Sequence, residues 1–366
     1  MKKTLTTLAA VSAFALMTTA AVADIKIGSA GPFSGQYASF GEQLSKGAEA
    51  AVADINAAGG VLGEMLVLSL GDDRCDPKEA VSVANKFVND GVVFVAGHFC
   101  SSSSIPASKI YDEEEIIMIT PASTNPKLTD DLSDYVFRVC GRDDQQGDVA
   151  GQYLVDKYEG KKIAIAHDKQ GYSKGLADLT KAAFEKAGGT VALYETVNPG
   201  ESDYTAFVTK LKAEGIDVLY YGGYHTELGL IMRQMADQGL SIDVVSGDAL
   251  NTAEFWSITG DAGEGLRFTF APDPRSNPAS KDLVAKFNAA GYDPEGYTLY
   301  SYAAIQIWAA AVKKAGSTDA DKVSEALHDG TDYASVIGNL SFDEKGDRTS
   351  ADYTWYTWTK GNYVQD

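Results

Sequence analysis

Residues 161–221 decide the fold of this chain, and they read KKIAIAHDKQGYSKGLADLTKAAFEKAGGTVALYETVNPGESDYTAFVTKLKAEGIDVLYY. Short apolar runs of strand length alternate there with longer segments whose apolar side chains recur at helical spacing. Strands are predicted at 161–166, 191–196 and 216–221, and helices at 174–187 and 204–214. This repeated strand–helix order predicts a parallel sheet with helices on both faces.

The same alternation extends over most of the 366 residues, a length that favours two domains. Upstream strands are predicted from Ile25 and at 65–70, 92–96 and 116–120, with helices after Gly41 and at 76–91 and 105–114. Downstream, a helix is predicted at 227–238 and a strand at 242–246. The pattern breaks near Gly141–Gly147, so we expect an α/β protein with two doubly wound parallel-sheet lobes.

The chain changes character after about Pro272. Helices are predicted at 281–290, 297–315 and 321–328, and strands near 340–343 and 353–358. We expect this tail to pack on the first lobe before it ends on the second. The predicted first lobe is therefore 24–142 plus 272–351, and the second is 143–271 plus 352–366.

Residues 1–23 have the composition of a secretion signal. A basic start precedes an apolar stretch up to about Met17, and Ala21 and Ala23 suit cleavage before Asp24. The apolar stretch is diluted by Thr and Ser and is short for a membrane span. We therefore expect an exported, periplasmic protein with no direct membrane insertion after the signal is cleaved.

The charge is strongly acidic. The formal net charge is −20, and it becomes −22 when Lys2 and Lys3 leave with the signal. Such a chain repels nucleic acid and anionic lipid, and it suits a soluble protein with a small ligand. The four histidines do not pair at i, i+4 spacing and no CxxC is present. We therefore expect neither a metal site nor a cofactor.

The three cysteines are Cys75, Cys100 and Cys140. Export permits a disulfide. Cys75 precedes a predicted helix and Cys100 follows a predicted strand, so the two can meet across one βαβ unit, and we predict a bridge between them. Cys140 lies in the apolar run 135–140, which favours a small buried side chain over a reactive thiol.

The segments that follow the predicted strands are where a ligand is expected, because open parallel sheets bind ligands beyond the carboxyl ends of their strands. These segments are GHFCSSSS at 97–104, TPAST at 120–124, HDKQGY at 167–172, GGYH at 222–225 and GD at 247–248. The serine run and Thr124 offer hydroxyls beside helix-start N–H groups, which suit a carboxylate. Asp248 suits an ammonium group.

Aromatic side chains complete the predicted pocket. Phe40, Tyr172, Tyr224 and Tyr297 offer apolar walls, three of them with polar tips. Together with the anion site and Asp248, they predict a pocket for an α-amino acid with an apolar side chain. The motifs of enzymes are missing: Ser34 is misplaced for a nucleophile elbow, and neither a dinucleotide-binding glycine pattern nor a phosphate-binding loop is present. We therefore predict a protein that is not an enzyme.

Seven stretches together resemble the periplasmic leucine/isoleucine/valine-binding protein family, the substrate-binding components of branched-chain amino acid ABC transporters. They are AVADINAAGG at 51–60, CDPK at 75–78, GHFCSSS at 97–103, MITPA at 118–122, HDKQ at 167–170, YYGGYH at 220–225 and DEKGD at 343–347. The resemblance covers essentially all of the chain after the signal.

The resemblance implies a type I periplasmic binding protein, with two lobes joined by three crossovers that close on the ligand at a hinge. It implies that Ser101, Ala122 and Thr124 hold the ligand carboxylate and share in holding its ammonium group. Tyr224 would lie over the ligand, and the acid at Asp248 would pair with the ammonium. The Cys75–Cys100 bridge matches the disulfide of the family.

The chain departs from the familiar family pattern at the pocket. Asp248 stands where a Glu is familiar, Phe40 where a Tyr is, and Phe99 where a Leu is, while the alignment at Tyr297 needs a gap. A hydrophobic pocket discriminates one methylene by only about 1–3 kcal/mol. The choice among Leu, Ile, Val, Ala and Phe therefore stays open at this point.

The sequence thus predicts a monomeric, non-enzymatic protein that captures an apolar, branched-chain L-amino acid and delivers it to the permease of an ABC transporter. Three alternatives remain. One is a sensor of the same fold that reports an amino acid or amide to a signalling partner. Another is a transport component for a different amino acid or a GABA-like ligand, and the last is an α/β hydrolase.

Overall fold

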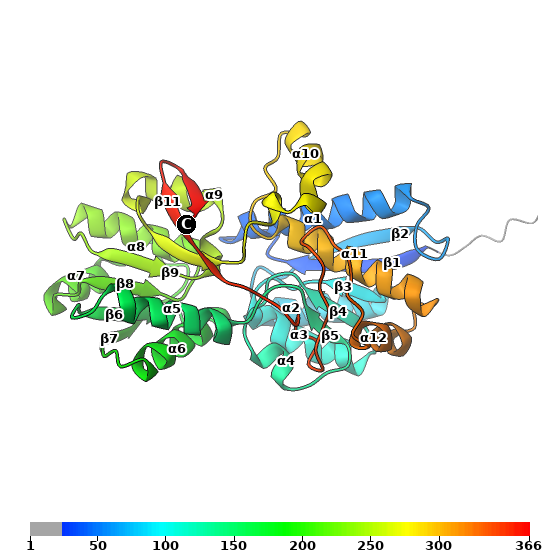
Figure 1. The fold of residues 1–366 in the computed structure, drawn as a ribbon, viewed down its shortest axis with the longest axis horizontal. Helices are drawn as coiled ribbons and strands as arrows, with labels where there is room; N and C mark the ends of the chain where they lie inside the picture. The colour runs from blue at the N-terminus through cyan, green and yellow to red at the C-terminus, as the bar shows by residue number, and fades with distance from the viewer. Residues whose placement is uncertain (1–23) are drawn as a thin grey trace, which may run out of the picture.

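The first sheet is parallel throughout, with the strand order β2-β1-β3-β4-β5. The computed structural model describes residues 24–366 and is drawn in Figure 1. The strands are β1 Ile25–Gly31, β2 Leu66–Asp72, β3 Phe94–Ala96, β4 Ile117–Thr120 and β5 Val136–Arg138. The helices between them are α1 Ala38–Ala57, α2 Pro77–Asp90, α3 Ser101–Glu113 and α4 Lys127–Asp130. We call the part built on this sheet the first lobe.

The second sheet has the strand order β12-β11-β10-β9-β8-β6-β7 and forms the second lobe. Its strands are β6 Ile163–His167, β7 Val191–Thr196, β8 Val218–Tyr221, β9 Asp243–Ser246, β10 Arg267–Phe270, β11 Thr354–Thr359 and β12 Asn362–Gln365. Its helices are α5 Asp143–Lys157, α6 Gly171–Lys186, α7 Thr205–Glu214, α8 His225–Asp237 and α9 Ala253–Thr259. The two lobes lie side by side in Figure 1.

The parallel cores of the two lobes have the same winding. The order β7-β6-β8-β9-β10 repeats the order β2-β1-β3-β4-β5, and in both the chain reverses its direction of winding after the second strand. The predicted fold class, α/β with two doubly wound parallel sheets, is therefore confirmed. β11 and β12 depart from it: β11 is antiparallel to β10, and a tight turn joins β11 to β12, which makes that pair antiparallel as well.

The tail contributes to both lobes. Its helices are α10 Lys281–Ala289, α11 Thr298–Ala315 and α12 Ala320–His328. α11 packs against α1, and Trp308 of α11 stacks on Phe94 of the first sheet with ring centroids 4.6 Å apart. The chain then returns to the second lobe as β11 (Figure 1). The strand predicted near 340–343 is wrong, since isolated bridges alone pair Leu340 with Tyr333 and Phe342 with Arg348.

Local chemistry sets the helix starts. Oδ1 of Asp76 accepts hydrogen bonds from the backbone N–H groups of Lys78 and Glu79 at 2.7 and 3.1 Å, and Pro77 is the first helical residue, so the predicted start of α2 is confirmed. α3 begins at Ser101, earlier than predicted, so the serine run forms its first turn. α5, α9 and β10 were not predicted.

The predicted secretion signal, residues 1–23, lies outside the described residues. Within residues 24–366, no helix combines the length and the apolar character that crossing a bilayer requires.

Candidate functional site

A small cavity between the two lobes brings together six of the eight predicted ligand residues. It is lined by Phe99, Ser101, Ala122, Tyr172, Tyr224, Asp248, Ala249 and Tyr297. The first three belong to the first lobe and follow β3 and β4, whereas Tyr172, Tyr224 and Asp248 follow β6, β8 and β9 of the second. The free volume of this cavity is about 10 Å³, counted as the space that the centre of a water molecule can occupy. This is room for about one water.

The other two predicted residues lie beside this cavity rather than in its lining. Phe40 is fully buried in α1 and stacks on Phe99 with ring centroids 4.5 Å apart. It also meets the ring of Tyr297 edge-on at 6.2 Å. Thr124 is 1 % exposed, and its hydroxyl is buried with no hydrogen-bond partner.

The first lobe presents hydroxyl and backbone groups to the cavity. Ser101 is the first residue of α3, and its Oγ accepts from the backbone N–H of Asn125 at 3.3 Å. The N–H of Ala122 donates to Oγ1 of Thr120 at 3.2 Å, so the carbonyl oxygen of Ala122 is its remaining backbone group. A hydroxyl at a helix N-terminus suits an anion, while a carbonyl oxygen suits a hydrogen-bond donor such as an ammonium group.

The second lobe presents a buried carboxyl, that of Asp248, which is 3 % exposed. The hydroxyl of Tyr172 and the Nε2 of Gln146 donate to its Oδ1 at 2.7 and 3.0 Å, and the hydroxyl of Tyr297 donates to its Oδ2. Burial raises the pKa of Asp248, and these hydrogen bonds oppose that rise because they stabilise the ionised form. A positive ligand group beside the carboxyl would lower the pKa further.

A second buried acid, Asp143, was missed by the sequence analysis. It is the first residue of α5, is fully buried, and shares Gln146 with Asp248, because Nε2 of Gln146 donates to both carboxyls, to Oδ1 of Asp143 at 3.2 Å. Burial raises the pKa of Asp143 well above its ordinary value, and the nearby Asp248 raises it further. The polar run 141–147 at the predicted border of the lobes is the feature of the sequence that could have pointed to Asp143. Solvated turns have the same composition, so the run does not distinguish a buried acid from an exposed one.

The disulfide lies next to Ser101, the residue that presents its hydroxyl to the cavity from the first lobe. Cys75 and Cys100 form the predicted bridge, with their Cα atoms 5.4 Å apart, so Ser101 directly follows a cross-linked residue. Cys140 is free and buried, and burial raises the pKa of its thiol to about 12. The predicted burial of Cys140 is therefore confirmed, and its interpretation as an unreactive side chain stays a prediction.

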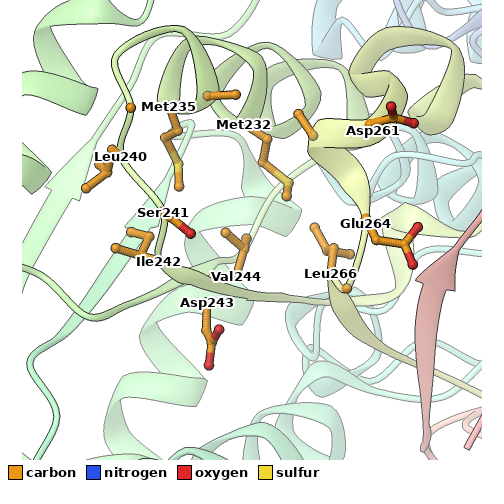
Figure 2. Close-up of a pocket in the computed structure, with 14 residues that line it drawn as sticks. Met232, Met235, Leu240, Ser241, Ile242, Asp243, Val244, Asp261, Glu264 and Leu266 are labelled. Carbon is orange, nitrogen blue, oxygen red and sulfur yellow. The ribbon is translucent and has the colours of Figure 1, made fainter.

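A larger groove lies on the outer surface of the second lobe, away from every predicted ligand residue. It has a volume of about 470 Å³, and its floor and rim come from the end of α8, the start of β9 and the turn before β10. Figure 2 shows Met232, Met235 and Leu266 directed into it and the acids Asp243, Asp261 and Glu264 at its edge. Among residues 24–366, no cluster of His, Cys, Asp and Glu has the makings of a metal site.

A ligand cavity between two doubly wound lobes defines the type I class of binding proteins. The chain belongs to the periplasmic binding protein family, whose sequence pattern matches residues 24–362. It is 49 % identical to the Leu/Ile/Val-binding protein homolog 1 of Brucella melitensis, with all of both chains covered.

Two solved structures have the same fold. A leucine-binding protein of Thermotoga maritima is 28 % identical, with a TM-score of 0.86 over 93 % of this chain and 97 % of its own. A branched-chain amino acid transporter substrate-binding protein of Streptococcus pneumoniae, solved with isoleucine, is 26 % identical. Its TM-score is 0.84 over 94 % of this chain and all of its own.

Proposed function

We propose that this protein is the substrate-binding component of an ABC-type amino acid transporter and that it captures an apolar L-amino acid between its lobes. The observation that carries the proposal is the buried carboxyl of Asp248 on one lobe, facing the hydroxyl of Ser101 on the other across a single cavity. The full-length similarity to a Leu/Ile/Val-binding protein homolog supports a branched-chain ligand. The protein presents its ligand unchanged and catalyses no reaction.

Each cavity residue has a proposed role. Ser101 and Thr124 hold the ligand carboxylate, whose negative charge is stabilised by the N-terminus of α3. Asp248 and the carbonyl oxygen of Ala122 hold the ammonium group. Charge-assisted hydrogen bonds of this kind are strong in a site that excludes water. The side chain of the ligand lies against five aromatic rings, those of Phe40, Phe99, Tyr172, Tyr224 and Tyr297.

Closure of the lobes is the proposed binding movement. We take the first lobe as 24–142 plus 272–351 and the second as 143–271 plus 352–366, with the hinge where the chain passes between them. The ligand contacts both lobes at once, so it stabilises the closed arrangement over the open one. The permease then recognises the closed monomer. Membership of the periplasmic binding protein family supports a periplasmic location.

The cavity has room for about one water, so every amino acid requires the rings or the lobes to move apart, and a second candidate is a ligand with a small side chain or none, which requires the least movement. Phe99 stacks on Phe40 and packs edge-on against Tyr297 at 5.2 Å, so three rings occupy one wall of the cavity. A leucine side chain needs these rings to move apart, whereas alanine or a GABA-like ligand needs less space. An ammonium group and a carboxylate are common to both candidates.

Calorimetric titration of ligand-stripped protein tests both candidates. The panel is Leu, Ile, Val, Ala, Phe, Glu and GABA, and we expect binding of about −8 kcal/mol or tighter, a micromolar Kd, for at least one apolar member. A preference for Leu, Ile and Val supports the first candidate, and a preference for Ala or GABA supports the second. A protein that binds no member of the panel contradicts the proposed function.

A further inference from the structure

The lobes also meet at a polar cluster outside the ligand cavity, which we call the Tyr37 cluster. Its members are Gln36 and Tyr37 of the first lobe and Asp168, Gln170, Gly200 and Glu227 of the second. Gln36 and Tyr37 precede α1, and the other four lie beyond the ends of β6, β7 and β8. The cluster adjoins the ligand cavity, because the ring of Tyr37 lies on that of Tyr224 with centroids 4.5 Å apart.

Glu227 is the common acceptor of the Tyr37 cluster. Three donors converge on its Oε1: Nε2 of Gln36 at 3.2 Å, the hydroxyl of Tyr37 at 3.2 Å and the N–H of Gly200 at 3.0 Å. The first two donors come from the opposite lobe. Oε2 of Glu227 is buried and has no partner. The three donors show that Oε1 is an acceptor in either protonation state, so the proton of a neutral carboxyl would be on Oε2, where an unpartnered hydroxyl costs less than an unpartnered ionised oxygen.

The hydrogen bonds continue from Glu227 across the interface. The hydroxyl of Tyr37 accepts from Nε2 of Gln170 at 2.7 Å, and the same Nε2 lies 3.2 Å from the Oδ2 of Asp168. The side chain of Tyr37 is 2 % exposed, so the first lobe inserts it fully among second-lobe groups. The chain of contacts thus exists only while the lobes are together.

The surroundings of Glu227 disfavour a negative charge. The side chain is 1 % exposed, and burial together with the neighbouring Asp168 raises its pKa to about 7, although the hydrogen bonds from Gly200 and Tyr37 oppose the rise. Burial also raises the pKa of Asp168, to about 6. The titratable groups that face Glu227 are Asp168 beyond β6, Tyr204 before α7, Tyr221 at the end of β8, Tyr224 before α8 and Tyr37 before α1. All of them are acids or phenols, so none of them brings a positive charge to offset a carboxylate, and only the hydroxyl of Tyr37 donates a hydrogen bond to it.

We propose that Glu227 is a positioning residue for closure: as a neutral carboxyl it accepts Gln36 and Tyr37 of the first lobe and so stabilises the ligand-holding state. The inference rests on the proposed function, because it assumes that ligand binding closes the lobes. Separation of the lobes removes both partners and admits water, which returns the pKa of Glu227 toward about 4.3. Closure therefore takes up a proton between about pH 4.3 and pH 7.

The sign of the pH effect follows from this proton uptake. The closed state binds the extra proton, so lowering the pH favours closure, and the contribution disappears as the pH rises above the closed-state pKa of about 7. We expect the Kd of the best ligand of the panel to be about tenfold lower at pH 6 than at pH 8 for this pair of pKa values.

Calorimetric titration of Glu227→Gln at pH 6 and pH 8 tests the proposal. The amide keeps a carbonyl oxygen at Oε1 and cannot ionise, so we expect one Kd at both pH values, close to that of the wild type at pH 6. The matched control is Glu201→Gln, an exposed acid on the neighbouring loop, which should keep the tenfold change. Thermal melting without ligand shows whether each variant is folded.

A second variant tests the contact without altering the carboxyl. Gln36→Ala removes one cross-lobe donor, so we expect weaker binding at both pH values although Gln36 does not line the cavity. Unchanged affinity in Gln36→Ala, or the wild-type pH dependence in Glu227→Gln, overturns the role of Glu227 and leaves the proposed function in place. A wild type that binds no member of the panel overturns the proposed function and the role of Glu227 with it.

Discussion

At the scale of single residues, the proposed partner of the ligand's ammonium group is Asp248. Asp248→Asn keeps the shape of the side chain and removes its charge. Loss of a charge-assisted hydrogen bond costs about 1.5–3 kcal/mol, so we expect the Kd for the best amino acid ligand to rise by roughly 10- to 150-fold. Calorimetric titration at pH 7 measures the change.

The control for this prediction is Asp243→Asn, which removes an exposed acid from the start of the same strand, β9. It changes the net charge of the protein by the same amount but is remote from the cavity lining. Equal affinities in both variants would show that Asp248 does not bind the ammonium group.

Phe99 is the residue that most limits the space for a ligand side chain. Phe99→Leu removes the ring that stacks on Phe40 and packs against Tyr297. We expect the Kd ratio of leucine to alanine to fall by about tenfold, within the 1–3 kcal/mol by which apolar pockets discriminate. Competition titration with both ligands measures this ratio, and Phe94→Leu, a buried ring of β3 away from the cavity, is the control. A ratio that moves equally in both variants would contradict this role of Phe99.

Cavity residues could be predicted from the sequence where they lie just beyond the end of a predicted strand. Ser101, Tyr224 and Asp248 each lie within five residues of a strand end, so the topology of each sheet places them at its edge, and the approach of the two lobes brings Ser101 to the other two. Asp143 and Gln146 were not predictable, because they lie on α5, a helix with a weak apolar pattern that was itself not predicted. Glu227 was not predictable either, since its partners are distant in sequence and meet it through the approach of the two lobes.

At the scale of elements, Arg138 connects the returning tail to residues 121–126, which we call the ligand loop because they include the proposed ligand residues Ala122 and Thr124. Its fully buried guanidinium pairs with Asp347 and donates to the carbonyl oxygens of Ser123 and Asn125, on either side of Thr124. Arg142, at the start of α5, pairs with the same Asp347 at 2.6 Å. One carboxylate in the tail thus fixes the last strand of the first sheet, the ligand loop and the first helix of the second lobe.

Asp347→Asn is therefore expected to destabilise the protein strongly. Removing one partner of a buried ion pair leaves an uncompensated charge and costs about 3–5 kcal/mol. Urea denaturation measures the free energy of unfolding. The control Asp90→Asn breaks the exposed pair of Lys86 and Asp90, for which we expect a change of about 1 kcal/mol or less. A loss from Asp347→Asn no greater than that of the control would contradict the structural importance of this pair.

Helices whose apolar residues recur at regular spacing were predicted closely. Strands that are recognisable only through their pairing with distant strands were not. α10, α11 and α12 match their predicted ranges within a few residues because their apolar faces repeat regularly. The strand predicted at 353–358 is confirmed as β11, whereas β10 and β12 were not predicted. β10 joins the sheet by pairing with β9 and β11, which are distant from it in sequence, so no local pattern identified its partners. The apolar run 340–343 forms isolated bridges because Ser341, Asp343 and the turn at Gly346 interrupt it.

At the scale of the whole molecule, the two lobes face each other through groups that suit opposite ends of an amino acid. The first lobe supplies hydroxyls and helix N–H groups, and the second supplies the carboxyl of Asp248. Neither lobe alone presents both groups, so the proposed function couples binding to closure. The Tyr37 cluster adds a second contact between the lobes, outside the cavity lining, and we propose that it makes the closed state sensitive to pH.

A crystal structure of the protein with the tightest ligand of the titration panel tests closure around an amino acid most directly. We expect the ammonium nitrogen within about 3 Å of a carboxyl oxygen of Asp248, and the carboxylate within about 3 Å of the hydroxyl of Ser101 or Thr124. Ligand density in the outer groove of Figure 2, or an amino acid whose carboxylate faces Asp248, would contradict this account of recognition.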